Sequence, residues 1–549
     1  MYKKLLSSNS ATKTGLLCLC TIFLARLLTL DMPDLVDTTE GRYAGVAQLM
    51  LQKNDWITPW INFHGEVKPY LGKPPLHFWL EQIAFLIFGQ NNFAARLPSL
   101  LSGAGIVAAI GIGVFILIGV EASVVAMATL ASSCLLFFLS GAVVLDVTLT
   151  LGVTIALVSF LVSNVSRLAR YTFFAGMALG VLVKGPLAMV LVGATIVPWV
   201  AVYRITSGAW PAQLSAIPWL RGLLLFLVLV LPWYLMAELR NPGFLEYFLW
   251  NENLGRYLKS DYGDEYGTGH TQPFGASFVM MLLACAPWSF IIAFVLFAER
   301  RHAFNTQAVQ SICAQPLLFF GIAWTLSCPV LLLGARQYTG TYLLPSVPGF
   351  AFLIAVLWGH CVQTGRIKSL RSILSSSIMI ATLTTIILAI VGLCLGASVL
   401  AMIFVVVLQI FLAIQSKGRA HSTHSSLGYM VLVTAILYGG VTLGLNTHLS
   451  ENRSTRQILA EAHLLPETSP GSVCLFFPYQ VPFSASFYAP LLTNPSLQLS
   501  SQSEENSEEN NCPYVIARLK EKDLPRFNQE ISALTEVKRT GRWRIFKRQ

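Results

Sequence analysis

Residues 94–119 read AARLPSLLSGAGIVAAIGIGVFILIG, a run that contains a single charged side chain, Arg96. A helix needs about 20 mostly apolar residues to cross the hydrocarbon core of a bilayer. This stretch therefore predicts a membrane-spanning helix. The same window finds about thirteen such spans along the chain, at approximately 15–30, 94–119, 122–141, 144–163, 171–184, 186–203, 219–236, 277–297, 315–333, 339–359, 373–391, 393–414 and 427–446.

The composition of the chain agrees with a polytopic membrane protein. Of its 549 residues, 54% are hydrophobic and only 12% are charged, whereas soluble domains average about 25% charged residues. This composition excludes an ordinary soluble enzyme, a coiled coil and a disordered chain. The net charge of +10 would suggest a nucleic-acid partner for a soluble protein. In a membrane protein it indicates orientation charges and contact with membrane lipids, so we expect no nucleic-acid partner.

The distribution of basic residues predicts the orientation of the chain. The first span follows Lys3 and Lys4 and has no small-residue cleavage site, so it predicts an uncleaved anchor with a cytoplasmic N-terminus. Alternate loops are then also basic, with Arg167, Arg170, Arg204, Arg300, Arg301, Arg366, Lys368, Arg371, Lys417 and Arg419. We expect residues 1–446 to form a transmembrane domain with two long outer loops, about 31–93 and 237–276. Residues 447–549 are expected to form a soluble domain on the outer face.

The composition of the C-terminal tail is that of a small α/β or α+β domain. Val473–Pro478, Tyr514–Arg518 and Trp543–Lys547 have strand character, and Lys522–Leu534 has helical character. Cys474 and Cys512 lie in this tail, outside the membrane. In an oxidising compartment they form either a disulfide or two unpaired thiols, and the sequence leaves both open.

An unusual set of polar residues gathers on the predicted outer face. Ionisable groups at the membrane edge are expensive and are therefore functional candidates. The set comprises Asp37, Glu40, Arg42, Tyr70, Lys73, Asp146, Lys184, Glu252, Arg256, His270, Arg336 and Tyr342. Basic residues on this face run against the orientation rule. Their gathering indicates a site for anionic groups with carboxylates nearby.

Each of these residues also has a structural explanation. Asp146 can cap a helix N-terminus, Lys184 can extend to the interface, and Arg42 can pair with Glu40 or Asp37. Arg256 and Arg336 can bind lipid headgroups, and a single His270 in a polar loop is more often structural than catalytic. No single residue decides between the two interpretations.

The first outer loop carries the most informative local pattern. Residues 38–44 (TTEGRYA) lead into a stretch, Val46–Gln52, with helical periodicity. Residues 70–76 (YLGKPPL) place two prolines directly after Lys73. The prolines stiffen the backbone and can present the lysine ammonium to a phosphate. The tryptophans of the loop, Trp56, Trp60 and Trp79, predict a pair of helices in the membrane interface.

The order of these motifs resembles a known family. It comprises residues 37–44 (DTTEGRYA), Asp55-Trp56, Lys73-Pro74-Pro75, Asp146, residues 183–186 (VKGP) and residues 340–345 (GTYLLP). The order is similar to that of GT-C glycosyltransferases of the protein O-mannosyltransferase superfamily, over residues 1 to about 360. Within that superfamily it is similar to the lipid A aminoarabinose transferases.

The resemblance implies an α-helical polytopic GT-C fold in a bacterial inner membrane. It also implies transfer of 4-amino-4-deoxy-L-arabinose, or a related sugar, from an undecaprenyl-phosphate carrier to a lipid A phosphate at the periplasmic face. Thr39-Glu40 stands where the family carries Asp-Glu, so Asp37 is a candidate substitute for the missing Asp. Gly72 stands where many members have Glu. A divalent metal is left open, and no ligands are assigned to it.

The chemistry assigns roles to these candidates. A polyprenyl phosphate leaves readily when basic groups in a water-poor site neutralise its developing charge. We expect Lys184 with Arg256 or Arg336 to bind the leaving phosphate, and Lys73 with Arg42 to bind an acceptor phosphate. A phosphate acceptor needs positioning more than deprotonation, whereas a hydroxyl acceptor needs a base, for which Glu40 and Asp146 are candidates. The remaining candidates for substrate binding are Tyr43, Tyr70, His270 and Tyr342.

Other functions remain as alternatives at this stage. The acceptor can be another surface glycan or an exported protein instead of lipid A. A lipid transporter or flippase is a more remote alternative, because transporters place polar groups near the midplane and often show repeats. A purely structural role would leave the charges of the outer face unexplained.

Overall fold

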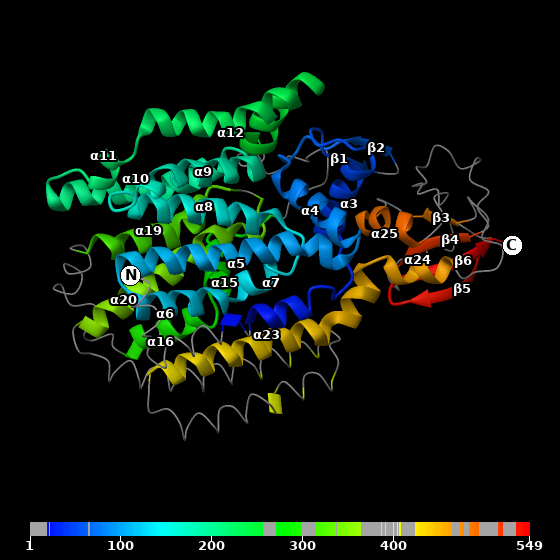
Figure 1. Cartoon of the computed structure of the whole chain (residues 1–549). Helices are drawn as coiled ribbons and strands as arrows, with labels where there is room; N and C mark the ends of the chain where they lie inside the picture. The colour runs from blue at the N-terminus through cyan, green and yellow to red at the C-terminus, as the bar shows by residue number, and fades with distance from the viewer. Residues whose placement is uncertain are drawn as a thin grey trace.

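A computed structural model describes most of the chain (Figure 1). The described residues are 19–20, 22–63, 66–255, 271–298, 315–335, 337–363, 423–463, 473–476, 482–492, 514–519 and 534–548, with isolated positions between 386 and 407. The predicted spans 373–391 and 393–414 therefore lie outside this range, apart from those positions. So do residue 512 and most of the predicted helix 522–534.

Long apolar helices form the body of the molecule. In the described part of the chain, five helical segments are long and apolar enough to cross a membrane. They are α5 (Asn92–Leu117), α8 (Leu145–Val162), α10 (Leu187–Ser207), α12 (Trp219–Arg240) and the continuous segment Gly340–His360, made of η2 (Gly340–Ser346) and α20 (Val347–Gln363). With α9 (Arg167–Lys184) and α19 (Pro316–Leu331), they confirm the helical, multi-pass fold.

Two of the predicted spans are each broken into two helices. The span 122–141 consists of α6 (Val120–Ala131) and α7 (Cys134–Leu139), and the span 277–297 consists of α15 (Ala276–Ala284) and α16 (Trp288–Ala298). The two breaks face each other, because the Cys134 N–H donates to the Ala286 carbonyl at 2.9 Å. Trp288 Nε1 also donates to Ser132 Oγ at 2.8 Å. Irregular backbone inside a membrane protein is tolerated where a neighbouring element satisfies it in this way.

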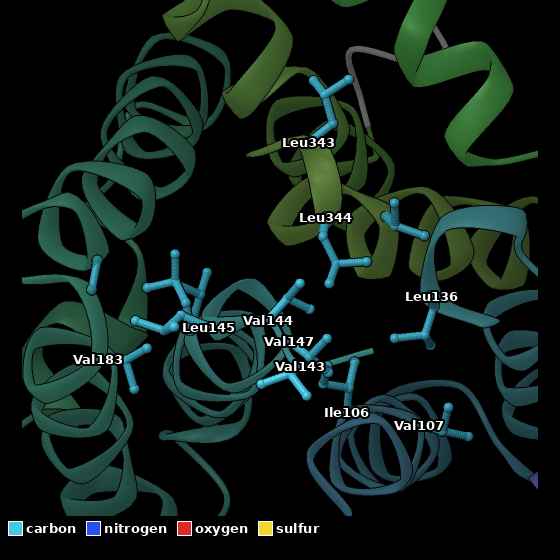
Figure 2. Close-up of a cluster of buried hydrophobic side chains, with 14 of the residues drawn as sticks. Ile106, Val107, Leu136, Val143, Val144, Leu145, Val147, Val183, Leu343 and Leu344 are labelled. Atoms are coloured by element: carbon cyan, nitrogen blue, oxygen red, sulfur yellow. The ribbon is translucent and has the colours of Figure 1, made fainter. Parts of the chain in front are cut away.

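Helix α8 lies at the centre of the bundle and is almost entirely buried. It packs closely against α9 because glycines stand at the contact. A Cβ on Gly152 would lie 2.7 Å from the Gly176 carbonyl, and one on Gly176 would lie 2.7 Å from the Ala156 nitrogen. Small residues permit this close approach of helix backbones in membranes. Aliphatic side chains from α5, α8, α9 and η2 fill the space around the start of α8 (Figure 2).

The first long loop is well structured and packs on the end of the bundle. It contains α3 (Thr39–Gln52), the antiparallel hairpin of β1 (Trp60–Phe63) and β2 (Glu66–Pro69), and α4 (Leu76–Phe88). The predicted helix in this loop is confirmed, although it begins at Thr39 and not at Val46. The prediction that the three tryptophans lie on a pair of interfacial helices is wrong for Trp56, which lies between α3 and β1, and for Trp60, which lies on a strand. The sequence Trp60–Phe63 has the aromatic and β-branched residues that favour a strand.

The C-terminal part of the chain adds a mixed sheet beside this loop. Helices α23 (Thr423–Arg453) and α24 (Arg456–His463) lead to β3 (Val473–Phe476), α25 (Phe483–Leu492), β4 (Tyr514–Arg518), β5 (Leu534–Thr540) and β6 (Trp543–Arg548). The strand order is β3-β4-β6-β5, with only the β3–β4 pair parallel. The three predicted strands are confirmed, and β5 is an additional strand.

The C-terminal part docks onto the first loop through α25 and α3 (Figure 1). A Cβ on Gly41 of α3 would lie 2.5 Å from the Ser484 backbone nitrogen of α25. The division of the chain at residues 446 and 447 stays a prediction, and α23 runs through it to Arg453.

Candidate functional site

A cavity of about 410 Å³ lies where the ends of several membrane helices meet the first loop. Its wall is mostly apolar, from residues of α10, α19 and the π-helical segment η1 (Tyr247–Gly255). Its polar side chains include two lysines and two carboxylates: Lys73, Lys184, Asp146 and Glu252. Five of the polar residues singled out in the sequence therefore line one cavity: Lys73, Asp146, Lys184, Glu252 and Tyr342.

The first ion pair joins the ends of two antiparallel helices. Lys184 is the last residue of α9, Asp146 lies in the first turn of α8, and Lys184 Nζ is 2.8 Å from Asp146 Oδ1. Each charge suits the helix dipole at its own helix end. The ammonium also lies 4.5 Å from the centre of the Tyr342 ring. Asp146 is thus more than a helix cap, because it neutralises a lysine that is only 8% exposed.

The chain turns sharply after Lys184, and the turn requires glycine. Gly185 has a φ of +69°, and a Cβ there would lie 2.5 Å from the ring of Phe248. Since side chains other than glycine rarely adopt this φ, Gly185 ends α9 at the point where its lysine meets Asp146. Phe248 lines the same cavity.

The second ion pair comes from two loops that are far apart in the sequence. Lys73 donates directly to Glu252 Oε1 of η1, and it also donates to the Gly72 carbonyl at 2.8 Å. Both side chains are largely buried. Lys73 is thus held directly before the two prolines that lead into α4. The sequence identifies Lys73 as a site residue, whereas the spacing in the chain gives no sign that Glu252 is its partner.

Glu40, a catalytic candidate, lies outside the cavity wall and is held by four hydrogen bonds. Its carboxylate accepts from Arg96 Nε and Nη2, both at 2.9 Å, and from the Val36 and Val143 N–H groups, both at 3.0 Å. Burial raises the pKa of Glu40, but the Arg96 guanidinium and these hydrogen bonds outweigh it, so the pKa lies below its ordinary value. This carboxylate links α3, α5 and the start of α8.

Asp37 also lies outside the cavity wall, at the contact with α25. Its Oδ1 accepts from the Ser484 N–H at 2.8 Å, and its Oδ2 accepts from Ser484 Oγ at 2.6 Å. Burial raises the pKa of Asp37 to about 6, although the hydrogen bonds from Ser484 oppose the change. Asp37 thus joins the first loop to the C-terminal part.

The aromatic and basic candidates of the first loop form a separate cluster. The Arg42 guanidinium lies 5.1 Å from the centre of the Tyr43 ring and 5.6 Å from that of Phe483 in α25. The rings of Tyr43 and Tyr70 lie 5.9 and 6.3 Å from that of Phe78. The predicted pairing of Arg42 with Glu40 or Asp37 is replaced by other partners for the carboxylates, Arg96 and Ser484.

Three further candidates, Arg256, His270 and Arg336, lie outside the described residues. In the described ranges, no group of three or more His, Cys, Asp or Glu side chains is placed to hold a metal ion. We therefore name no metal ligands.

Sequence reasoning did not single out Arg96 and the pair His77–Glu81 as partners of site elements. Arg96 is the lone charge of its apolar stretch, which was a usable signal. His77 and Glu81 are fully buried, with Nε2 and Oε1 3.0 Å apart. His77 Nδ1 also lies 2.9 Å from Thr148 Oγ1 of α8. Their positions i and i+4 on α4 place them on one face.

Comparisons with known proteins bear on the family and the fold of the chain. Residues 16–248 match the family model of dolichyl-phosphate-mannose-protein mannosyltransferases. In fold, the chain is similar to the crystal structure of ArnT from Cupriavidus metallidurans bound to undecaprenyl phosphate, with a TM-score of 0.75 over 98% of each chain at 18% identity. The apo structure of the same protein gives a TM-score of 0.73. The chain therefore has the helical, multi-pass GT-C fold of that structure.

Sequence comparison adds relatives of known name to this likeness in fold. The chain is 28% identical over 343 residues to the undecaprenyl phosphate-alpha-4-amino-4-deoxy-L-arabinose arabinosyl transferase of Shewanella sediminis, a match that covers 60% of this chain and 57% of the relative. It is 26% identical over 407 residues to the Yersinia pestis protein of the same name, covering 72% of this chain and 68% of the relative. The protein is thus similar to the lipid A aminoarabinose transferases.

Proposed function

We propose that the protein transfers 4-amino-4-deoxy-L-arabinose, or a closely related sugar, from an undecaprenyl-phosphate carrier to a phosphate of lipid A. The observation that carries the proposal is the apolar cavity in which Lys73 and Lys184 lie beside two carboxylates. The names of the similar proteins support the donor and the sugar.

The cavity suits a phosphate attached to a long apolar chain. The two lysines supply positive charge for the phosphate, and Leu187, Val190 and Leu331 supply an apolar wall for the prenyl units next to it. Val190 is 48% exposed on the outside of α10, so the cavity wall continues to the surface that faces lipid. The carrier enters from the bilayer and keeps its chain in an apolar environment.

The ion pairs explain how a largely apolar cavity tolerates two lysines. A charge in an apolar cavity is stable only when it is paired, and Asp146 and Glu252 serve as counter-ions for Lys184 and Lys73. When the carrier phosphate arrives, it takes over part of this pairing. The lysines are then already charged and oriented for the group that leaves.

The transfer step follows from the charges. An oxygen of the acceptor phosphate attacks the anomeric carbon of the sugar. The bond from that carbon to the carrier oxygen breaks, and its electron pair leaves with the carrier phosphate. Lys73 and Lys184 neutralise the leaving phosphate, and Asp146 keeps Lys184 oriented. Lys73 takes this role in place of the acceptor-phosphate role expected from the sequence, because it shares a cavity with Lys184 that Arg42 does not line. A direct displacement of this kind inverts the anomeric configuration, and a retained configuration in the isolated product would contradict it.

The proposal includes an orientation in the inner membrane. We infer that the N-terminus is cytoplasmic and that the first loop and the residues after 446 face the periplasm, since basic residues gather in alternate loops. The cavity then opens at the periplasmic end of the helices, where a lipid A acceptor is available.

The experiment that tests the function is mass spectrometry of lipid A from three strains. These are a deletion strain, the same strain complemented with the wild-type protein, and one complemented with Lys184→Ala. We expect a phosphate-linked sugar mass that is absent from the deletion strain, returns with the wild type, and does not return with the variant. Lipid A that is the same in the deletion and wild-type strains contradicts this acceptor.

A second acceptor class has one observation in its favour. The matching family model is named for transfer of mannose to protein. A serine or threonine hydroxyl acceptor needs a general base, and Asp146, the sequence candidate for that role, lines the cavity together with Glu252. Sugar found on exported proteins together with unchanged lipid A would select this alternative.

A further inference from the structure

A second cavity, of about 530 Å³, lies between the N-terminal end of α5 and the helices α24 and α25. It is lined by residues from three distant parts of the chain, among them Asp31, Phe88, Phe93, Arg456 and Leu491. It shares no lining residue with the cavity of Lys73 and Lys184. The proposed transfer reaction makes no use of it.

The position of this cavity places it at the surface of the bilayer. Helix α5 is a membrane-crossing helix, and Asn92 and Phe93 at its start line the cavity. The adjoining end of α4 is strongly apolar and exposed, with Leu86 at 63%, Ile87 at 66% and Phe88 at 49%. On the other side, Leu28 of the first helix and Met32 are exposed next to Asp31. Exposed apolar residues beside a membrane helix end face lipid, so acyl chains reach the rim of the cavity.

The polar wall carries charges of both signs. Arg456 Nη1 is 2.8 Å from Asp34 Oδ1, its guanidinium lies 5.8 Å from the centre of the Tyr488 ring, and its side chain is 45% exposed. Asp31 is exposed in the same wall. The side chains of Arg456, Asp31 and Asp34 together carry a net charge of −1. This balance disfavours a headgroup that is only anionic, and it favours one that carries an ammonium beside its phosphate.

The rest of the polar wall is rigid. The Tyr488 hydroxyl accepts from the Leu35 N–H at 2.7 Å and donates to Asn92 Oδ1 at 2.6 Å. Asn91 caps α5 by accepting from the Ala94 N–H at 2.8 Å. The charged groups of the cavity wall are the Arg456 guanidinium, which pairs with Asp34 through Nη1, and the Asp31 carboxylate.

We propose that this cavity binds a zwitterionic phospholipid, with the lipid phosphate at Arg456, its ammonium at Asp31 and its acyl chains along Phe88 and the exposed end of α4. The bound lipid connects the membrane helices to the C-terminal part of the chain. A guanidinium suits a phosphate because it offers several donors in one plane.

The test measures lipid retention by native mass spectrometry of the full chain. The protein is exchanged into nanodiscs with equal amounts of phosphatidylethanolamine and phosphatidylglycerol. We expect the wild type to retain phosphatidylethanolamine. Asp31→Asn should lower the ratio of retained phosphatidylethanolamine to phosphatidylglycerol about tenfold, since one hydrogen bond to a charged group is worth about that factor. This variant leaves the Arg456–Asp34 pair intact.

Two further variants complete the test. Arg456→Ala should lower the retention of both lipids, with the melting temperature checked because the Asp34 pair is lost. Arg539→Ala, an exposed arginine on β5, should change neither retention nor the ratio. A wild type that prefers phosphatidylglycerol, or a ratio unchanged by Asp31→Asn, overturns the proposal.

Discussion

At the scale of single residues, the candidate site consists of lysines whose charge is maintained by particular carboxylates. Asp146 holds Lys184 and Glu252 holds Lys73. The carboxylates nearest to the family motif in the sequence, Asp37 and Glu40, have other partners. The residues of the motif thus divide into those that face the cavity and those that fix the elements around it.

Replacing Lys184 tests the leaving-group assignment. Lys184→Ala should lower transfer by at least about 100-fold, since a preorganised charge at the developing anion is worth that much in catalysis. Lys184→Arg should keep part of the activity because it keeps the charge. The rate is measured with a synthetic polyprenyl-phosphate sugar donor in detergent.

The matched control for Lys184 lies on the same helix. Arg167→Ala changes an exposed basic residue at the opposite end of α9, and it should leave the rate unchanged. Equal losses in both variants would mean that α9 tolerates no charge deletion, and the assignment of Lys184 would then be wrong.

Substitutions of Glu40 and Asp146 should have different effects when the melting temperature and the transfer rate are both measured. Glu40→Gln breaks a buried ion pair with Arg96, which typically costs about 3–5 kcal/mol. We expect it to lower the melting temperature and the transfer rate together. Asp146→Asn also removes the counter-ion of Lys184, but the Asp146 carboxylate accepts one hydrogen bond where that of Glu40 accepts four. It should therefore lower the rate with a smaller change in melting temperature. A stable but inactive Glu40→Gln protein would return Glu40 to the catalytic role that the sequence predicts.

At the scale of elements, the spacing between α8 and α9 sets the position of the first ion pair. The two helices run antiparallel with glycine at their contact, and their ends carry Asp146 and Lys184. The network of His77, Glu81 and Thr148 fixes α4 against α8 in turn. Lys73 and Asp146 therefore keep their relative positions through contacts made outside the cavity.

Enlarging a glycine at the α8–α9 contact tests this dependence. A Cβ on Gly176 would lie 2.7 Å from the Ala156 nitrogen, so Gly176→Ala should push the helices apart. The expected cost is about 1–3 kcal/mol of stability, with a loss of transfer greater than the loss of folded protein. Gly193→Ala on α10 is the control, because nothing lies within 4 Å of its Cβ. Thermal melting and transfer rate are measured for both.

Many of the helices were predictable from the sequence, for physical reasons. Apolar runs identify helices such as α5 and α8 because the bilayer demands their length. The breaks at Ser132–Ser133 and Cys285–Pro287 were missed because the spans were identified by hydropathy alone, although Pro287 was a usable signal for the second break. The hairpin Trp60–Pro69 was missed because its tryptophan was assigned to the interface.

The sequence predicted which types of residue form the site, but it did not predict which of these residues pair with one another. Lysines on the predicted outer face conflict with the orientation rule, which drew attention to Lys73 and Lys184. The pairs Lys73–Glu252 and Glu40–Arg96 join residues 179 and 56 positions apart. Such pairings depend on how helices pack, which no local pattern in the sequence determines.

At the scale of the whole molecule, the first loop and the C-terminal part form one continuous contact. Asp37 accepts from Ser484, and the Asp37 N–H donates to the Arg453 carbonyl at 2.9 Å. Burial raises the pKa of Asp37 to about 6, above its value in an unfolded chain. A carboxyl with a raised folded-state pKa is protonated at low pH in both states.

This pKa predicts how the stability of the contact depends on pH. As pH rises from about 4 to about 6, the unfolded chain ionises first and the contact loses stability, and above that range the effect levels off. Asp37→Asn should remove this dependence. The measurement is the melting temperature of both proteins in detergent from pH 4 to pH 8. A wild type that gains stability over this range relative to Asp37→Asn contradicts the prediction.

The contact between the two distant parts of the chain also determines when the first loop can finish folding during synthesis. The Leu35 N–H finds its acceptor in Tyr488, 453 residues later, and Asp34 finds Arg456 422 residues later. Ribosomes add about 5–20 residues per second, so these groups wait roughly 20–90 s after their own synthesis. During that interval the first loop is unfinished. Chaperones and proteases can therefore meet it before its last partner exists.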